Sequence, residues 1–238
     1  MSRKTSSSRS LAFVYGTLKQ GFSNHWLMED VMTKGHARFV GIASTKKRYP
    51  LVCGPFQVPF LLDMPACGCH VRGELYEVDR VAIDHLDELE GVSKGHYVRR
   101  PLALTGLQSL QFFNYDPSGE IQAEAYFAAA PLTQGLAASS AHIEAYTKKQ
   151  TVNYVPRKDR PQNRTFLEHV NAWIESQSQS VQLEGPAHGN RNPSHQSEIV
   201  LLQLQGWPST WIRSIEPKPG DTHHHQIFLD HAKQVAVF

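Results

Sequence analysis

The sequence predicts an α+β fold in which a small, mixed and largely antiparallel β-barrel carries helices on its outside. Short apolar or alternating runs, which are typical of strands, outnumber the segments with helical spacing. These runs follow one another in an order that suits antiparallel pairing, and turn residues separate them. Hydrophobic residues make up 40% of the chain, which is enough for a core of this kind.

Eight segments are predicted as strands. The clearest is 71–78, which alternates polar and apolar residues as a strand with one buried face does. Pro59 interrupts another segment, which we therefore expect at an edge or a bend of a sheet. The turn 116–119 is expected to join the last two segments as a hairpin. The predicted strands are 11–15, 39–43, 51–53, 58–62, 71–78, 97–104, 110–115 and 123–128.

Two helices are predicted within this series. Asn24 can cap the first, which continues through residue 31 and which Gly35 ends. The second has apolar residues at helical spacing over 81–89, between Asp79 as its N-cap and Gly91 as its end.

Composition divides the chain into four parts. Residues 1–10 are polar and rich in Ser, and we expect them to be disordered; residues 11–164 form the folded domain. Residues 165–178 are predicted as an amphipathic helix that Thr165 can cap. Residues 179–238 are predicted as a linker and a poorly ordered extension, to which we assign no fold.

Charge and cysteine content indicate a cytoplasmic protein that binds neither nucleic acid nor membranes. The net charge is only +2, from 24 basic and 22 acidic residues, so no strong field attracts a polyanion. No apolar stretch reaches the ~18 residues that a membrane span needs, and none resembles a signal-peptide core. The three cysteines are too few and odd in number for a disulfide framework, which favours a reducing compartment.

The turn after the first strand is a candidate binding loop formed by Tyr15, Gly16, Thr17 and Leu18. Gly16 permits a sharp exit from the strand, and the start of the next helix leaves backbone N–H groups unpaired. Such donors bind carboxylate or carbonyl oxygens. An ordinary strand-to-helix turn is the alternative interpretation of the same residues.

Glu90 is the candidate catalytic residue. It follows Leu86 by four residues, so it lies on or near the inward face of the predicted helix, in its last turn. Burial and the negative end of the helix dipole both raise the pKa of a carboxyl group there, which favours a general base near neutral pH. The alternative, a solvated acidic face, applies to Asp84 and Glu88 and could extend to Glu90.

A zinc-binding protein is a further alternative, and we do not favour it. Cys67, Cys69 and His70 lie together and Cys53 lies upstream, but their spacing differs from that of ordinary zinc knuckles. The run 223–225 of three histidines lies in a polar tail and is expected to be solvated. We therefore predict no metal site.

Several blocks of the sequence, in order over residues 11–164, together resemble the γ-glutamylcyclotransferase superfamily and within it the γ-glutamylamine cyclotransferase, or AIG2-like, branch. The blocks are Val-Tyr-Gly-Thr-Leu-Lys-x-Gly-x-x-Asn at 14–24, Tyr-Pro-Leu-Val at 49–52, Val-Pro-Phe-Leu-Leu at 58–62, Gly-Glu-Leu-Tyr-Glu-Val-Asp at 73–79, Leu-Asp-Glu-Leu-Glu at 86–90, Tyr-x-Arg at 97–99 and Asn-Tyr-x-Pro-Arg at 153–157. The first ten residues, the Cys-Gly-Cys-His stretch and everything after 165 have no counterpart.

The resemblance implies a small mixed barrel and a ring-closing reaction without a cofactor. The α-amine of a γ-glutamyl group attacks its own side-chain carbonyl, which expels an amine and leaves 5-oxoproline. The implied roles are proton transfer by Glu90, binding of the glutamyl head by the loop 15–18, and lining of the pocket by Tyr97 and, as a weaker candidate, Tyr126. The segment that contains Tyr154 is given no role.

The substrate is less strongly indicated than the reaction. The branch favours γ-glutamyl amines such as γ-glutamyl-ε-lysine, with γ-glutamyl amino acids as the alternative within the same enzyme class. From a different class, the domain could be a non-catalytic binding module of the same fold. The retained Glu90 and the intact Tyr-Gly-Thr-Leu sequence of the loop argue against that alternative. No feature of the sequence indicates an oligomeric state.

Overall fold

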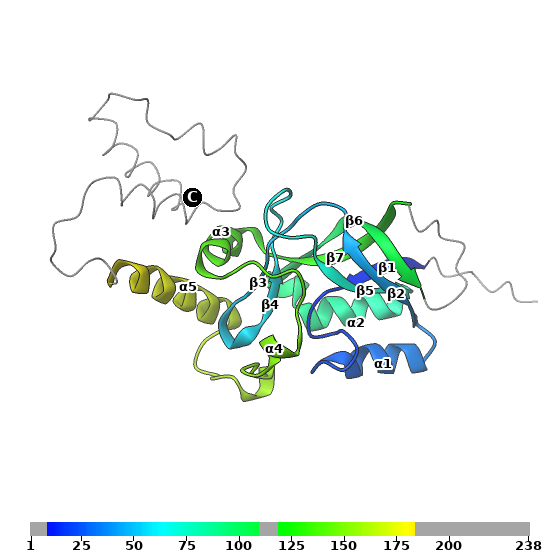
Figure 1. Ribbon diagram of the computed structural model, residues 1–238. Coiled ribbons are helices and arrows are strands. Elements are labelled where there is room, and N and C mark those ends of the chain that lie inside the picture. Colours follow the sequence, from blue (N-terminus) through cyan, green and yellow to red (C-terminus); the bar gives the residue numbers. More distant parts are fainter. Residues whose placement is uncertain (1–8, 110–118, 184–238) are drawn as a thin grey trace, which may run out of the picture.

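A closed five-stranded barrel forms the centre of the molecule (Figure 1), in a computed structural model that describes residues 9–109 and 119–183. The strands are hydrogen-bonded in the order β1, β5, β2, β6, β7, and β7 returns to β1 to close the barrel. This last pairing is parallel and the others are antiparallel, so the predicted mixed barrel is confirmed. The bounds are β1 (Ser10–Val14), β2 (Ala37–Thr45), β5 (Arg72–Val78), β6 (Tyr97–Ser109) and β7 (Ile121–Ala128).

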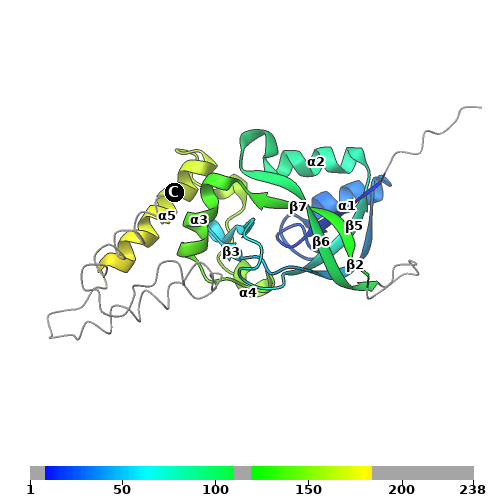
Figure 2. The same ribbon diagram turned by 90° about the horizontal axis from the view of Figure 1, so that it is seen from above.

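A separate two-stranded sheet and the helices surround the barrel. The sheet pairs β3 with β4, which confirms that the segment with Pro59 lies at an edge. In both ribbon views this sheet lies between the barrel and the helices α3 and α5 (Figures 1 and 2). The bounds are β3 (Leu51–Cys53), β4 (Pro59–Leu61), α1 (His25–Thr33), α2 (Arg80–Glu90), α3 (Ala130–Ser139), α4 (Lys148–Thr151) and α5 (Phe166–Leu183), with short 3₁₀ turns at Pro55–Gln57, Val92–Lys94 and Arg157–Asp159.

Side chains that point to alternate faces of the barrel strands form two separate buried clusters. One cluster takes residues from all five barrel strands, among them Phe13, Leu75 and Leu104, and fills the interior. The other takes their neighbours, such as Val14 and Tyr76, and packs them beneath α1 and α2. Because side chains point to alternate faces of a strand, one run of residues supplies both clusters.

Several expectations need correction. The structure extends β6 to Ser109 and pairs β7 with its first half, from Tyr97 opposite Ala128 to Leu104 opposite Ile121. The predicted strand 110–115 and most of the turn 116–119 lie outside the described residues. The helices α3 and α4 were not expected, because α3 has few large apolar residues and α4 is a single turn.

Helix α5 is longer than predicted. Thr165 and Glu168 bond each other's backbone amides at its start, as a capping box does, but the helix continues past 178 to Leu183. The Ser and Gln residues after 176 indicated a linker, yet the segment contains no Gly or Pro to stop the helix. The extension 184–238 and residues 1–8 lie outside the described part of the chain. Within that part, no helix is long and apolar enough to cross a membrane.

Candidate active site

The loop after β1 is held in place by hydrogen bonds from residues at the start of α1. Asn24 begins α1, but its side chain does not cap the helix; it donates instead to the Thr17 hydroxyl at 2.9 Å. The backbone N–H of Asn24 donates to the Thr17 carbonyl, and the His25 ring contacts the Leu18 carbonyl. A Cβ atom on Gly16 would lie 2.7 Å from the Pro59 ring, so only glycine lets the loop approach β4 this closely.

Three successive amide groups of this loop have no partner. The N–H groups of Gly16, Thr17 and Leu18 donate to no other group in the described part of the chain. The loop and Asn24 line the same cavity, so these donors lie next to open space. Consecutive unpaired N–H groups are able to bind a carboxylate or a developing oxyanion.

The hydroxyl groups of Tyr15 and Tyr97 hold the scaffold together. Tyr15 donates to the Tyr126 carbonyl at 2.6 Å and accepts from the Leu61 amide, which ties β1 to β7 and β4. Tyr97 donates to the Pro59 carbonyl at 2.9 Å, and its ring stacks on Phe60. Both rings line the cavity, but each hydroxyl already donates its proton to a backbone carbonyl.

Glu90 lies at the last position of α2, against the same cavity. The Asp79 carboxylate accepts from the Ala82 amide to begin the helix, and Gly91 ends it in the left-handed conformation, as predicted. Burial raises the pKa of Glu90 from its usual value of 4.5 to about 7. Among the described residues, no hydrogen bond or ion pair engages its carboxylate. Such a group gains and loses a proton near neutral pH.

Asp87, one turn before Glu90, belongs to a network of its own. Its carboxylate accepts from the Tyr126 hydroxyl at 2.7 Å and from Arg99 Nε at 3.0 Å. Arg99 also pairs with Glu124 on β7. The network fixes Tyr126 at the wall of the cavity and keeps Asp87 paired, so two neighbouring carboxylates of one helix have different environments.

The cavity has a volume of about 540 Å³, within the range of small-molecule sites. It brings together every site residue that the sequence predicts, and the weaker candidate Tyr126 as well. These residues are Tyr15, Gly16, Thr17, Leu18, Glu90, Tyr97 and Tyr126.

The residues that line the other end of the cavity were not predicted from the sequence. This end is formed by residues after 153 and by a turn after α2, and it is rich in cationic and aromatic side chains. The residues are Lys94, His96, Tyr154, Arg157, Arg160, Arg164, Phe166 and His169. We call this set of residues the cationic wall. The block 153–157 was the one signal in the sequence for the cationic wall, and the expected domain boundary at 164 divides it.

The three cysteines remain unpaired, and Cys67 is buried. In the described part of the chain, no three His, Cys, Asp or Glu side chains come together as metal ligands would. Burial raises the pKa of the Cys53 thiol to about 11, which makes it a poor nucleophile. The absence of a metal from the function stays a prediction.

A barrel with a pocket that joins a loop of free amides to a buried carboxylate defines a class, the γ-glutamyl cyclotransferase-like proteins. The family model described as "Gamma-glutamyl cyclotransferase, AIG2-like" matches residues 12–148. The chain belongs to this family of enzymes.

Named relatives agree with this assignment. A provisionally named γ-glutamylcyclotransferase of Arabidopsis thaliana is 43% identical over 178 residues, which cover 72% of this chain and 95% of that protein. A Rattus norvegicus γ-glutamylaminecyclotransferase is 46% identical over 80 residues, 33% of this chain and about half (53%) of its own length. The crystal structure of an AIG2-like protein from Mus musculus has a TM-score of 0.52 and 33% identity, and the match covers 64% of this chain and 99% of that one.

Proposed function

We propose that the protein is a γ-glutamylamine cyclotransferase, which releases an amine and 5-oxoproline from a γ-glutamyl amide. The observation that carries this proposal is that Glu90, with its pKa raised to about 7, lines one cavity with the unpaired amides of Gly16, Thr17 and Leu18. A proton acceptor and an oxyanion site are the two devices that an amide-cleaving ring closure needs.

In the first step, the ionised Glu90 takes a proton from the α-ammonium group of the glutamyl head. The free α-amine then attacks the γ-carbonyl carbon and forms the new C–N bond of the ring. The carbonyl oxygen becomes an oxyanion, which the loop amides stabilise by about 3 kcal/mol for each well-placed donor.

In the second step, the tetrahedral intermediate collapses. Glu90 passes its proton to the original amide nitrogen, the bond from carbon to that nitrogen breaks, and Glu90 takes the extra proton from the positively charged ring nitrogen. The amine and 5-oxoproline are then both neutral, and the proton on Glu90 passes to the released amine, which leaves as an ammonium ion and restores the carboxylate. No cofactor is required, because nucleophile and electrophile belong to one molecule and their effective molarity is high.

The proposed substrate class is that of γ-glutamyl amines, with γ-glutamyl-ε-lysine as the example. The names of the rat relative and of other similar proteins support the amine class. The name of the Arabidopsis relative is that of the broader activity. Both substrate types belong in the assay, with release of 5-oxoproline and of the free amine measured for each.

Glu90→Gln tests the proposal. The substitution keeps size and hydrogen-bonding capacity but removes the base, so we expect 5-oxoproline release from γ-glutamyl-ε-lysine to fall by about two or more decades. Glu88→Gln is the matched control, since Glu88 is an exposed carboxylate of the same helix that does not line the cavity. A folded Glu90→Gln protein with the turnover of Glu88→Gln would contradict the assignment.

A further inference from the structure

The end of the cavity formed by residues after 153 carries an excess of positive charge. Arg157, Arg160 and Arg164 line it, and Lys94 adds a fourth cation from the turn after α2. No ion pair joins any of the four to a carboxylate of the described residues. Cations that gather at a concave surface and form no ion pair with a carboxylate are suited to an anionic ligand.

Arg160 is held in place by its surroundings. Its guanidinium group lies 5.5 to 5.8 Å from the ring centres of Phe56, Tyr154 and Phe166, and its Nε donates to the Val155 carbonyl at 2.9 Å. These contacts fix the orientation of the fork at little further cost in entropy when a ligand binds.

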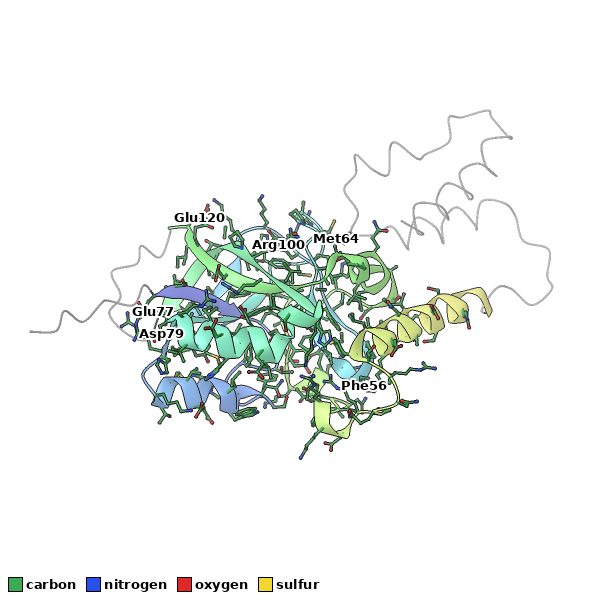
Figure 3. The ribbon with its side chains drawn as sticks, turned by 180° about the vertical axis from the view of Figure 1, so that it is seen from behind. Phe56, Met64, Glu77, Asp79, Arg100 and Glu120 are labelled. Carbon is green, nitrogen blue, oxygen red and sulfur yellow. The ribbon has the colours of Figure 1, made fainter. Side chains whose placement is uncertain are left out.

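Phe56 reaches this position through a strained backbone. Phe56 and the next residue, Gln57, have φ values of 59° and 56°, which non-glycine residues rarely adopt. Figure 3 shows Phe56 near the first turns of α5, where its ring packs edge-on against His169. The fold thus tolerates two unfavourable conformations where an aromatic ring supports Arg160.

The electrostatics of nearby groups agree with a local positive potential. Burial and the charge of Arg157 lower the pKa of His96, and Lys94 adds to this effect. Burial lowers the pKa of Arg160; Tyr154 and Tyr97 raise it, and Arg157 lowers it by a smaller amount.

Tyr97 lies between the two ends. Its pKa is raised mainly by burial, with Glu90 raising it further and Arg160 lowering it. The Tyr97 ring stacks on Phe60, Phe60 stacks on Phe166, and Arg160 lies over Phe166, so these contacts lead from Tyr97 to the arginines in the lining of one cavity. A glutamyl head at Glu90 would direct the attached amine toward the cationic end.

We propose that Arg157, Arg160 and Arg164 form a subsite for a carboxylate on the distal end of the leaving amine. The protein then prefers γ-glutamyl amides whose leaving amine carries a carboxylate at that end, as the lysine of γ-glutamyl-ε-lysine does, and disfavours those that carry an ammonium group there without a carboxylate. This inference rests on the proposed function. The forked guanidinium groups match the planar geometry of a carboxylate.

Three matched substrates test the preference in the full chain. γ-Glutamyl-6-aminohexanoate ends in a carboxylate, γ-glutamylhexylamide in a methyl group, and the γ-glutamyl amide of 1,5-diaminopentane in an ammonium group. We expect kcat/KM to be about tenfold or more higher for the carboxylate than for the methyl substrate, since a hydrogen-bonded charge pair contributes about that much. The ammonium substrate should be the poorest of the three.

Two variants and one control assign the preference to the subsite. In Arg157→Gln, which removes a charge, and Arg160→Lys, which keeps the charge but removes the fork, the ratio of kcat/KM for the carboxylate and methyl substrates should fall toward one. Lys158→Gln removes a charge from the same 3₁₀ turn outside the cavity and should leave the ratio unchanged. Equal losses on all three substrates would overturn the inference, because the arginines would then bind the glutamyl head or support the fold.

Binding separates this inference from the proposed function. Dissociation constants of the same three compounds for Glu90→Gln, measured by calorimetry, do not depend on turnover. A preference for the carboxylate compound that Arg157→Gln removes would support the subsite, even if no substrate released 5-oxoproline and the proposed function failed. Equal dissociation constants for all three compounds would overturn the subsite, even if the parent protein cleaved each of them.

Discussion

At the scale of single residues, the role proposed for Glu90 comes with a cost in stability. Its carboxylate is partly buried without a partner in the described part of the chain, and the ionised form is disfavoured there. The raised pKa makes the group a useful base at neutral pH. The same shift means that the folded protein is less stable with Glu90 ionised than with a neutral side chain of the same size.

Glu90→Gln should therefore stabilise the fold at high pH and have little effect at low pH. Below about pH 4.5 the carboxyl is protonated in both the folded and the unfolded chain, and no penalty exists. As the pH rises through 4.5 to 7 the unfolded chain ionises first, so the penalty grows and levels off above pH 7 at about 3 kcal/mol.

Urea denaturation at pH 4.5 and pH 8 measures this difference. The free energy of unfolding of Glu90→Gln should exceed that of the parent at pH 8, and the two should be close at pH 4.5. Glu88→Gln, at an exposed position, should show no such dependence on pH. If the gain at pH 8 were missing, the burial of the carboxylate would not be what raises its pKa.

The sequence predicted this residue because its signal is local. Position 90 follows from the spacing of Ile83 and Leu86 on one helix, and the helix end follows from Gly91. The pairing of Asp87 with Tyr126, by contrast, joins residues 39 positions apart. No period along the chain encodes such a contact, so the difference between Asp87 and Glu90 appears only in the structure.

At the scale of elements, α5, whose first residues line the cavity, packs closely against α3. Gly135 in α3 leaves no room for a side chain, since a Cβ atom there would lie 2.7 Å from Ile174 on α5. In the same helix α5, Val170 lies in the core and the Phe166 ring stacks on Phe60. A glycine within α3, which weakens a helix, is here a packing requirement.

Gly135→Ala should destabilise the protein by about 1 to 3 kcal/mol, as overpacking does, although alanine favours an isolated helix by about 1 kcal/mol. In the Ile174→Ala background the clash is removed, and the same substitution should become neutral or stabilising. Thermal denaturation of the four proteins measures the sign change. An unchanged effect of Gly135→Ala in both backgrounds would contradict the contact.

The elements predicted best were those with a strong hydrophobic periodicity or with clear capping or turn residues at their ends. The helix α2 and the strand β5 have both, and their observed bounds lie within one or two residues of the expected ones. Helix α3 was missed because its apolar face consists of Leu132 and Leu136 and lacks a side-chain cap. Its stability comes from tertiary packing, which local propensity does not report.

At the scale of the whole molecule, one cavity unites segments from both ends of the described chain. It takes residues from Phe13 to His169, whereas the family match ends at residue 148. The cationic wall therefore lies largely beyond the part of the chain that the family model covers. A boundary at 164, drawn from composition, separates residues that line the same cavity.

Truncation tests this placement. A chain that ends after Leu183 keeps every residue of the cavity and should retain 5-oxoproline release. A chain that ends after Arg164 loses Phe166, His169 and the buried Val170, so its melting temperature and its activity should both fall. Equal activity of the two truncated chains would show that α5 is dispensable for the site.

The closure of the barrel has a consequence for how the chain folds. The hydroxyl of Tyr15 finds its acceptor 111 positions later, and β1 acquires its second neighbour only when β7 has been synthesised. Contacts of such long range make folding slow, in the range of milliseconds to seconds for barrels. A nascent chain will thus hold the loop 15–18 on a strand with at most one neighbour until the ribosome has added more than a hundred further residues. During this interval the unpaired edge of the strand is open to other polypeptides.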